Sequence, residues 1–374
     1  MLEKTSGAVG CFHCQTLGAD ETCPICSRPV CARCAEGDTC PVPHRRQLRL
    51  GLGKRLRSVC PDGTRGVVSG WTGGTALVDL TRKERIAPLA MVRFGAGTGP
   101  WPMMATAGRL AAAAVTMTGQ AYMLVGAPEG PGMHQVKLPE VDSTNIEKLN
   151  VNRLAISEDG SLGAAVRSDL TVDLVDLAQP ELLGTVKEQG EAVQSAALSA
   201  GLDLLALGLY GRLRLYRVSD RQRLGTLSPR DLDGDVAWVG FSRGRLATVA
   251  GNGRCLVYDI RRSDSPSSWP RALELDLMPS SSAADVVGEQ PRGTRRVVAD
   301  LSPDGSLLAV RQGKRWVKIF PVAGGEPAVL EGHTDRVCLI KFVRDGKVLV
   351  TADYDNRVFY WPRAIIEPPE PART

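Results

Sequence analysis

The sequence of 374 residues has no apolar run long enough to cross a membrane as a helix. Its longest strongly apolar stretches, such as residues 110–115, fall far short of the roughly 20 residues that a spanning helix needs. No charged start followed by an apolar segment comes after Met1, as a secretory signal would require. We therefore expect a cytoplasmic protein with no membrane contact. Cytoplasmic thiols are normally reduced, so disulfides are the weakest use for its cysteines.

Motifs of common enzymes are also missing. The chain holds only four histidines, which leaves few candidates for general acid–base chemistry. It has no glycine-rich phosphate loop, no H-E-x-x-H and no G-x-S-x-G in a strand–turn–helix context. The formal net charge of +5 is mild and implies no particular partner. We therefore expect a protein that is not an enzyme.

Cysteine, by contrast, is concentrated near the start of the chain. Residues 11–44 offer four pairs of metal ligands, in which three pairs are C-x-x-C and the fourth is C-x-x-x-H. A C-x-x-C turn lets two sulfurs converge on one tetrahedral ion, so eight ligands suffice for two closed zinc sites. The segment is too short for a useful hydrophobic core, and metal binding would supply most of its folding free energy.

The spacing of these ligands, x2, x8, x2, x4, x2, x5 and x3, resembles a B-box-type, cross-braced zinc finger. The resemblance implies that the first and third pairs share one zinc ion and that the second and fourth pairs share another. Site 1 would then consist of Cys11, Cys14, Cys31 and Cys34. Site 2 would consist of Cys23, Cys26, Cys40 and His44.

Two other uses of this segment are less favoured. A RING finger would usually place a histidine in the middle of the motif, whereas His13 lies between two cysteines. A redox dithiol needs only one C-x-x-C, and three in succession would interfere with it. Many B-boxes carry histidine where this chain has Cys14 or Cys40, so the subfamily stays open.

From about residue 56 onward, short apolar segments alternate with Gly, Asp and Asn turns, and helical periodicity is almost absent. Seven of these segments share a β-rich pattern and recur at intervals of 41 to 62 residues. They are TALVD, AYMLV, TVDLV, RLRLY, RCLVY, WVKIF and RVFYW. Turns of one kind, CPDG, SEDG, SPDG and VRDG, precede four of them. The period fits a four-stranded unit.

This combination resembles WD40 repeats, and the best copy is residues 330–361, from LEGH to the terminal Trp361. The resemblance implies a mainly β, seven-bladed propeller over residues 47–363, between the finger (1–46) and a proline-rich tail (364–374). It also implies a structural hydrogen-bond network, formed by His333, Thr351, Asp355 and Trp361. The same residues could be mistaken for a catalytic constellation.

Two segments have special places in this scheme. Because the last repeat ends at its third strand, we expect residues 47–53 to close the ring as the missing outer strand. Their alternation of Leu48, Leu50 and Leu52 with polar or small residues fits a strand. Residues 263–293 are rich in serine and proline and indicate an inserted surface loop, within which RALELDL suggests the outer strand of the fifth blade.

A basic segment, residues 45–57, invites a nucleic-acid hypothesis because it has six basic residues and no acidic one. No aromatic residue is interleaved for base stacking, so we favour a structural role for it. The remaining cysteines, Cys60, Cys255 and Cys338, fit ordinary turn or core positions.

The preferred function is therefore a non-catalytic scaffold that holds protein partners, whose identity is open. The alternatives are the recognition subunit of a ubiquitin-like ligase and a nucleic-acid-binding protein.

Overall fold

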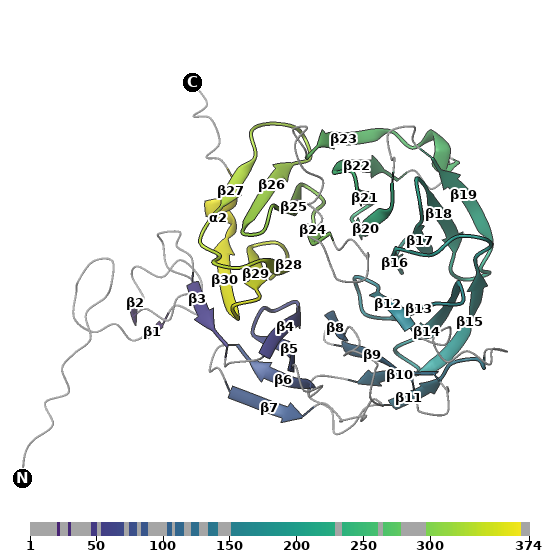
Figure 1. The fold of residues 1–374 in the computed structure, drawn as a ribbon, viewed down its shortest axis with the longest axis horizontal. Helices are drawn as coiled ribbons and strands as arrows, with labels where there is room; N and C mark the ends of the chain where they lie inside the picture. Colours follow the sequence, from purple (N-terminus) through teal and green to yellow (C-terminus); the bar gives the residue numbers. More distant parts are fainter. Residues whose placement is uncertain are drawn as a thin grey trace, which may run out of the picture.

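The computed structural model arranges most of the strands in a ring around a central axis (Figure 1). It describes residues 21–22, 29–30, 46–50, 54–70, 75–80, 84–88, 103–106, 109–115, 121–126, 134–140, 151–228, 234–260, 265–277 and 297–367. The ring is a β-propeller, so the predicted mainly β propeller fold is confirmed.

Within these residues, six four-stranded antiparallel sheets each use four strands that follow one another in the chain. The first sheet contains β4 (Lys54–Val59), β5 (Arg65–Gly70), β6 (Thr75–Asp79) and β7 (Glu84–Pro88). The second contains β8 (Met103–Thr106), β9 (Arg109–Val115), β10 (Ala121–Gly126) and β11 (His134–Lys137). The third contains β12 (Val151–Ile156), β13 (Leu162–Arg167), β14 (Thr171–Asp176) and β15 (Glu181–Lys187).

The next three sheets repeat this plan. The fourth contains β16 (Ser195–Ser199), β17 (Leu204–Gly208), β18 (Leu213–Arg217) and β19 (Arg223–Leu227). The fifth contains β20 (Val236–Ser242), β21 (Arg245–Ala250), β22 (Arg254–Asp259) and β23 (Arg271–Asp276). The sixth contains β24 (Ala299–Leu301), β25 (Leu307–Gln312), β26 (Trp316–Pro321) and β27 (Ala328–Leu330).

A seventh sheet, the closing sheet, contains strands from both the beginning and the end of the chain and so closes the ring. It consists of β28 (Val337–Val343), β29 (Val348–Asp353), β30 (Arg357–Pro362) and β3 (Arg46–Arg49). Strand β3 pairs antiparallel with β30, with Leu48 opposite Val358. Of the segment 47–53 proposed for this place, residues 47–49 lie in β3, and the backbone N–H of Leu50 still donates to Asn356 O at 2.8 Å.

The first strands of the sheets line the axis, and the fourth strands form the rim (Figure 1). Neighbouring first strands contact one another around the ring, and β28 of the closing sheet contacts β4 of the first sheet. Each sheet is therefore covered on both faces by its neighbours. This is why middle strands such as β17 are buried along their whole length, whereas rim strands such as β23 are largely exposed.

The tight turns between first and second strands account for the repeated x-x-Asp-Gly pattern. In residues 60–63, 157–160, 302–305 and 343–346, the glycine N–H donates to the carbonyl three residues earlier, at 2.7 to 3.1 Å. The glycines have φ between +71° and +83°, a left-handed conformation that favours glycine because it lacks a Cβ.

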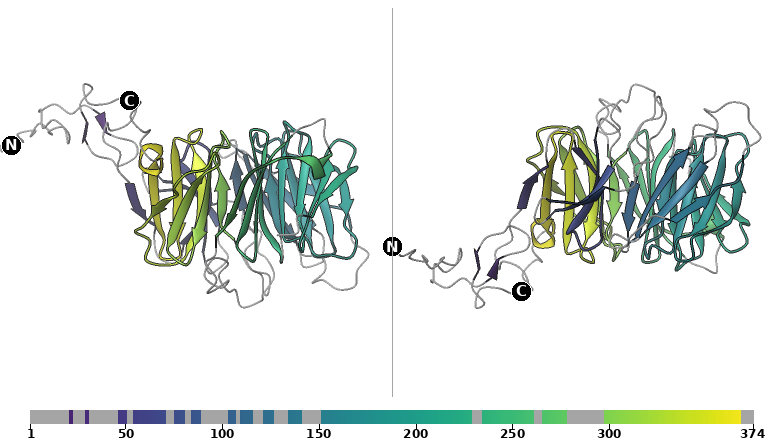
Figure 2. Two further views of the ribbon diagram at one scale, coloured as in Figure 1. Left: turned by 90° about the horizontal axis from the view of Figure 1, so that it is seen from above. Right: turned by 90° about the horizontal axis from the view of Figure 1, so that it is seen from below.

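The ring has two ends, which Figure 2 shows edge-on. Because every sheet contains four antiparallel strands, every first strand begins at the same end of the ring. We call this the entry end, and it also carries the turns between second and third strands. The opposite end, which carries the x-x-Asp-Gly turns, is the turn end.

Part of the predicted insertion, residues 263–293, is described, and it contains the outer strand expected at RALELDL. Residues 265–277 include the 3-10 turn η2 (Pro266–Ser268) and strand β23, which forms the outer strand of the fifth sheet. Residues 278–296 lie outside the described residues. The ring ends with the four-residue helix α2 (Arg363–Ile366). Among the residues that the structure describes, no helix is long and apolar enough to span a membrane.

Candidate functional site

The eight predicted zinc ligands, Cys11, Cys14, Cys23, Cys26, Cys31, Cys34, Cys40 and His44, all lie outside the described residues. Two short strands beside them are described. Strand β1 (Glu21–Thr22) pairs antiparallel with β2 (Pro29–Val30), so that Glu21 faces Val30 and Thr22 faces Pro29. In the sequence, Cys23 follows β1 and Cys31 follows β2 directly.

A buried polar network lies inside the closing sheet. His333 is 2.9 Å from Asp353 Oδ2 through Nδ1 and 2.7 Å from Thr351 Oγ1 through Nε2. The indole N–H of Trp361 donates to the same Thr351 oxygen at 2.9 Å. Phe359 packs edge-on against the His333 ring, with the ring centroids 4.6 Å apart. Both imidazole nitrogens are therefore held within the sheet, as a structural role requires.

The prediction that Asp355 is the fourth member of this network is wrong, because Asp353 takes that place. The Asp355 carboxylate accepts from Thr334 Oγ1 at 2.6 Å and is exposed, whereas Asp353 is buried beside His333. The reason is the strand period. Thr351 and Asp353 are two residues apart in β29 and face the same side, but Asp355 follows the end of the strand. The Asp353 carboxylate also accepts from the Arg357 N–H at 2.9 Å, which fixes the turn into β30.

Other sheets carry different residues at the strand positions that form this network in the closing sheet. By strand register, Thr248 of β21 occupies the position of Thr351, and Tyr258 that of Trp361. The Thr248 hydroxyl is buried and has no hydrogen-bond partner among the described residues. In the third sheet, Arg167 occupies the position of Asp353 and contacts the buried Asp173. Burial raises the pKa of that carboxyl, although the Thr185 hydroxyl and the Arg167 charge oppose the shift.

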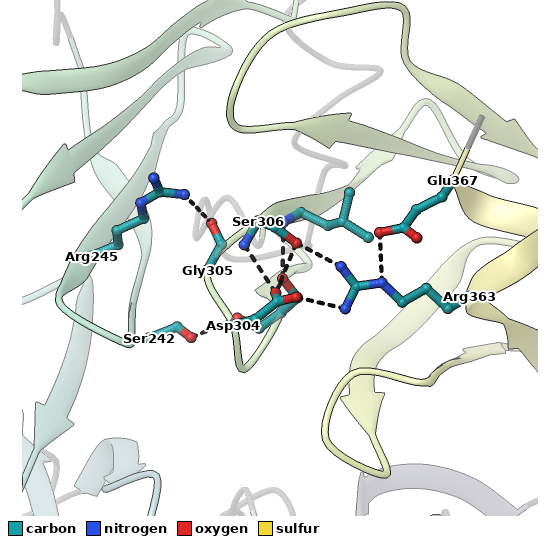
Figure 3. A network of polar contacts seen from close by, with 9 residues as sticks. Ser242, Arg245, Asp304, Gly305, Ser306, Arg363 and Glu367 are labelled. Carbon is teal, nitrogen blue, oxygen red and sulfur yellow. Dashed lines mark hydrogen bonds and ion pairs between the residues drawn. The ribbon is translucent and has the colours of Figure 1, made fainter. Parts of the chain in front are cut away.

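At the turn end, a polar network links three sheets through the turn 302–306 (Figure 3). Asp304 accepts from the backbone N–H of Ser306 and from two serine hydroxyls. Arg363, the first residue of α2 directly after the closing sheet, lies 2.7 Å from Asp304 Oδ2 and donates to Ser306 Oγ at 2.8 Å. From the fifth sheet, Arg245 donates to Gly305 O at 2.7 Å.

The surroundings of Asp304 favour the ionised form of its carboxyl. Partial burial raises its pKa, but the hydrogen bonds from Ser302, the Ser306 N–H and Arg363 outweigh burial and hold the pKa well below its usual range. The turn therefore carries a negative charge that binds the closing sheet to the sixth sheet through Arg363.

A similar junction joins the closing sheet to the first sheet, where the last and first sheets of the ring meet. The backbone N–H of Arg344 donates to Pro61 O at 2.6 Å, and its side chain donates to Asp62 O at 3.0 Å. The buried hydroxyl of Tyr360 donates to Gly63 O at 3.0 Å. Three hydrogen bonds to one turn thus supplement the pairing of β3 with β30.

A pocket of about 480 Å³ opens near the turn 201–204 of the fourth sheet. Its walls include the apolar side chains of Leu202, Leu204, Leu224, Ile260 and Trp269. Its polar groups are already engaged: Asp203 accepts from Ser219, and Arg217 pairs with Asp220. The pocket is therefore lined by both apolar and polar groups, and its charged side chains already have partners.

The entry end presents two large exposed aromatic side chains. Tyr210, in the turn between β17 and β18, is 60% exposed, and Trp316, at the start of β26, is 52% exposed. The neighbouring turn residues Lys314 and Arg315 are also exposed. Exposed aromatic and arginine side chains are the residue types enriched in protein–protein interfaces.

The three cysteines outside the predicted finger lie in the ring. Burial raises the pKa of the Cys60 thiol to about 11 and that of the Cys338 thiol to about 12, and it also raises the pKa of Cys255. Thiols with raised pKa values are poor nucleophiles and poor metal ligands. Among the residues that the structure describes, no three His, Cys, Asp or Glu side chains group as a metal site.

Comparison of the chain with protein-family models and with curated proteins found no match.

Proposed function

We propose that this protein is a non-catalytic scaffold that holds protein partners on the entry end of its ring. The observation that carries the proposal is the pair of exposed aromatic side chains, Tyr210 and Trp316, on turns of the fourth and sixth sheets. Tyrosine and tryptophan are enriched in protein–protein interfaces relative to the rest of the surface. The ring holds these turns at fixed relative positions, because each sheet packs between two neighbours.

We further propose a two-zinc, B-box-like module at residues 1–46 as a second binding surface. The pairing of β1 with β2 supports it. This two-residue antiparallel pair lies between the second and third of the proposed ligand pairs, with Cys23 and Cys31 next to its strands in the sequence.

In this module, Cys11, Cys14, Cys31 and Cys34 would hold one ion, and Cys23, Cys26, Cys40 and His44 the other. The thiolates and the imidazole suit zinc, which would contribute folding free energy rather than chemistry.

Metal analysis of the reduced protein tests the zinc module. We expect two zinc ions per chain and the loss of one of them in Cys31→Ser. No bound metal in the reduced protein would refute the module.

Affinity purification from the native host, with wild type beside Cys31→Ser, tests the scaffold. Partners lost with the substitution belong to the zinc module, and partners retained belong to the ring. If the ring retains partners, these should be lost from a Tyr210→Ser/Trp316→Ser variant that still folds. A ring that binds no protein in stoichiometric amount would contradict the proposal.

A further inference from the structure

Four arginines from three different sheets converge at the entry end, beside the junction of the closing and first sheets. Arg55 and Arg57 belong to β4, Arg311 to β25, and Arg336 immediately precedes β28. The Arg55 guanidinium lies 4.2 Å from the centre of the Tyr354 ring, and the Tyr354 N–H donates to Arg336 O at 3.1 Å. We call these four arginines and Tyr354 the mouth cluster.

The side chains of the mouth cluster are set into the ring. Arg311 is 3% exposed, and its Nη1 donates to Val337 O at 2.9 Å. Arg55, Arg57 and Arg336 are half-buried. Leu56, between the two arginines of β4, packs in the core between the first and closing sheets, and the pairing of β4 with β5 shifts register between Leu56 and Ser58. The guanidinium groups are therefore held by the fold at the inner ends of the sheets.

Their positive charges are close enough to affect one another. Burial, followed by the charge of Arg336, lowers the pKa of Arg311 to about 10. Burial and the charge of Asp353 raise the pKa of the neighbouring Cys338 thiol, and the charges of Arg57, Arg55 and Arg311 oppose that rise. Concentrated cations in a partly desolvated place attract anions more strongly than the same charges spread over a surface.

The surroundings add to the positive charge. Val337 N–H donates to Lys314 O at 2.8 Å, which places the exposed turn 314–316 directly beside the cluster. That turn supplies Lys314, Arg315 and the apolar face of Trp316. Of the acidic residues in the neighbouring turns, Asp335 accepts from the Arg336 N–H, and Asp355 accepts from Thr334.

We propose that the mouth cluster binds an acidic segment of a protein partner, with its carboxylates on the half-buried arginines of the cluster and its apolar residues on Trp316. This inference rests on the proposed scaffold function and names the kind of partner that the scaffold takes. Arginine suits the role because its planar fork binds a carboxylate through two parallel hydrogen bonds.

The placement favours a peptide over a nucleic acid. The mouth cluster lies at the inner ends of the strands, beside the exposed turn 314–316. A nucleic-acid backbone is instead tracked by exposed cations along a groove, with aromatic groups for its bases. Arg49, the exposed basic residue of β3, lies on a rim strand and not in the cluster.

Binding of a fluorescein-labelled, glutamate-rich peptide to the full-length protein, followed by fluorescence anisotropy, tests the proposal. We expect saturable binding that weakens as salt is added. The double variant Arg55→Gln/Arg336→Gln removes two guanidinium groups and keeps the half-buried arginine positions polar. It should weaken binding roughly tenfold to a hundredfold, the range expected for losing charged hydrogen bonds. Lys314→Glu/Arg315→Glu changes only exposed residues and should weaken binding in the same direction.

The matched control is Arg243→Glu/Lys347→Glu, which makes the same charge change at exposed positions of the turn end. It should bind the peptide as wild type does. Equal binding to wild type and to both entry-end variants would overturn the proposal. Tighter binding of single-stranded DNA or of a phosphorylated peptide than of the glutamate-rich peptide would overturn the assignment to carboxylates. Partners recovered on the ring by affinity purification would still support the scaffold in either case.

Discussion

At the scale of single residues, the stability of the ring depends on how completely its buried polar groups are satisfied. Thr351 is the centre of the network in the closing sheet, because its hydroxyl meets both the indole of Trp361 and the imidazole of His333. Donation can run in one direction, from Trp361 to Thr351, then to His333 and finally to Asp353. The neutral tautomer of His333 with its proton on Nδ1 completes this chain.

Thr351→Val should therefore destabilise the protein, because it leaves a buried indole N–H and a buried imidazole nitrogen without their partner. The expected loss of unfolding free energy is about 2–4 kcal/mol, the cost of one or two unsatisfied buried groups. Urea denaturation followed by tryptophan fluorescence measures it.

Thr248→Val is the matched control, because Thr248 occupies the same strand position in the fifth sheet and its hydroxyl has no partner among the described residues. This variant should be neutral or slightly more stable. Equal losses in the two variants would show that the network around Thr351 adds nothing to stability.

The lowered pKa of Asp304 leads us to expect that the free energy of unfolding falls in acid. The pKa of this carboxyl is lowered in the folded protein, so its contribution is fully present above the unfolded pKa of about 4 and is lost as pH falls toward the folded pKa. Asp304→Asn removes the ionisable group. The free energy of unfolding should then fall less steeply between about pH 5 and pH 3 than in wild type.

Circular dichroism during denaturant titrations at each pH gives this slope. Asp345→Asn, in the corresponding turn of the closing sheet, removes a carboxyl that forms no contact with Arg363. Its slope should match that of wild type, and a wild-type slope in Asp304→Asn would contradict the assignment of the acid loss to the Asp304–Arg363 contact.

The correction of Asp355 to Asp353 also belongs to this scale. The WD40-like pattern around residues 330–361 points to His333, Thr351 and Trp361, which the structure joins by hydrogen bonds. It leaves two aspartates as candidates for the carboxylate. Strand alternation from Thr351 selects Asp353, because residues two apart share a face. The signal was therefore present in the sequence, but it needed the end of β29 to be placed correctly.

At the scale of elements, local patterns anticipate the strands well. The seven β-rich segments found in the sequence correspond to third strands, for example TVDLV in β14 and RVFYW in β30. Third strands are easily found because neighbouring sheets bury both their faces, so their apolar runs are nearly continuous. Rim strands such as β15 are more exposed, and they leave a weaker pattern.

The outer strand of the closing sheet packs against the core through Leu48, and the partly buried Leu50 that follows the strand contacts the same core. Leu48 of β3 is buried among Val350, Val358 and Tyr360, between the closing and first sheets. Leu48→Ala should destabilise the protein by about 2–5 kcal/mol, as expected for a cavity at a packed site. Thermal unfolding and denaturant titration measure this loss.

Gln47→Ala is the control for Leu48→Ala, because Gln47 is exposed on the opposite face of the same strand. It should change stability by no more than about 0.5 kcal/mol. Similar effects of the two substitutions would show that β3 does not pack against the core.

At the scale of the whole molecule, the features that matter most come from parts of the chain far apart in sequence. The mouth cluster brings Arg55 and Arg57 beside Arg311 and Arg336, and no local pattern links them. The basic segment 45–57 is visible in the sequence, but ring closure divides it between the outer strand of one sheet and the inner strand of the next. Composition could predict a charge there, but not the direction in which each side chain would face.

Ring closure itself gives the last prediction. Deleting residues 1–50 removes β3 and leaves β30 as an open edge, with unpaired backbone groups and the apolar surface that Leu48 covers. Deleting residues 1–44 removes the predicted zinc module and keeps β3. We expect the longer deletion to lower the Tm and to promote aggregation, because the exposed edge can pair with other chains. The shorter deletion should keep the Tm of the ring, since its hydrogen bonds to β3 remain.

Differential scanning calorimetry and light scattering distinguish the two deletions. A Tm that falls equally in both deletions would mean that the zinc module, and not β3, stabilises the junction between the closing and first sheets.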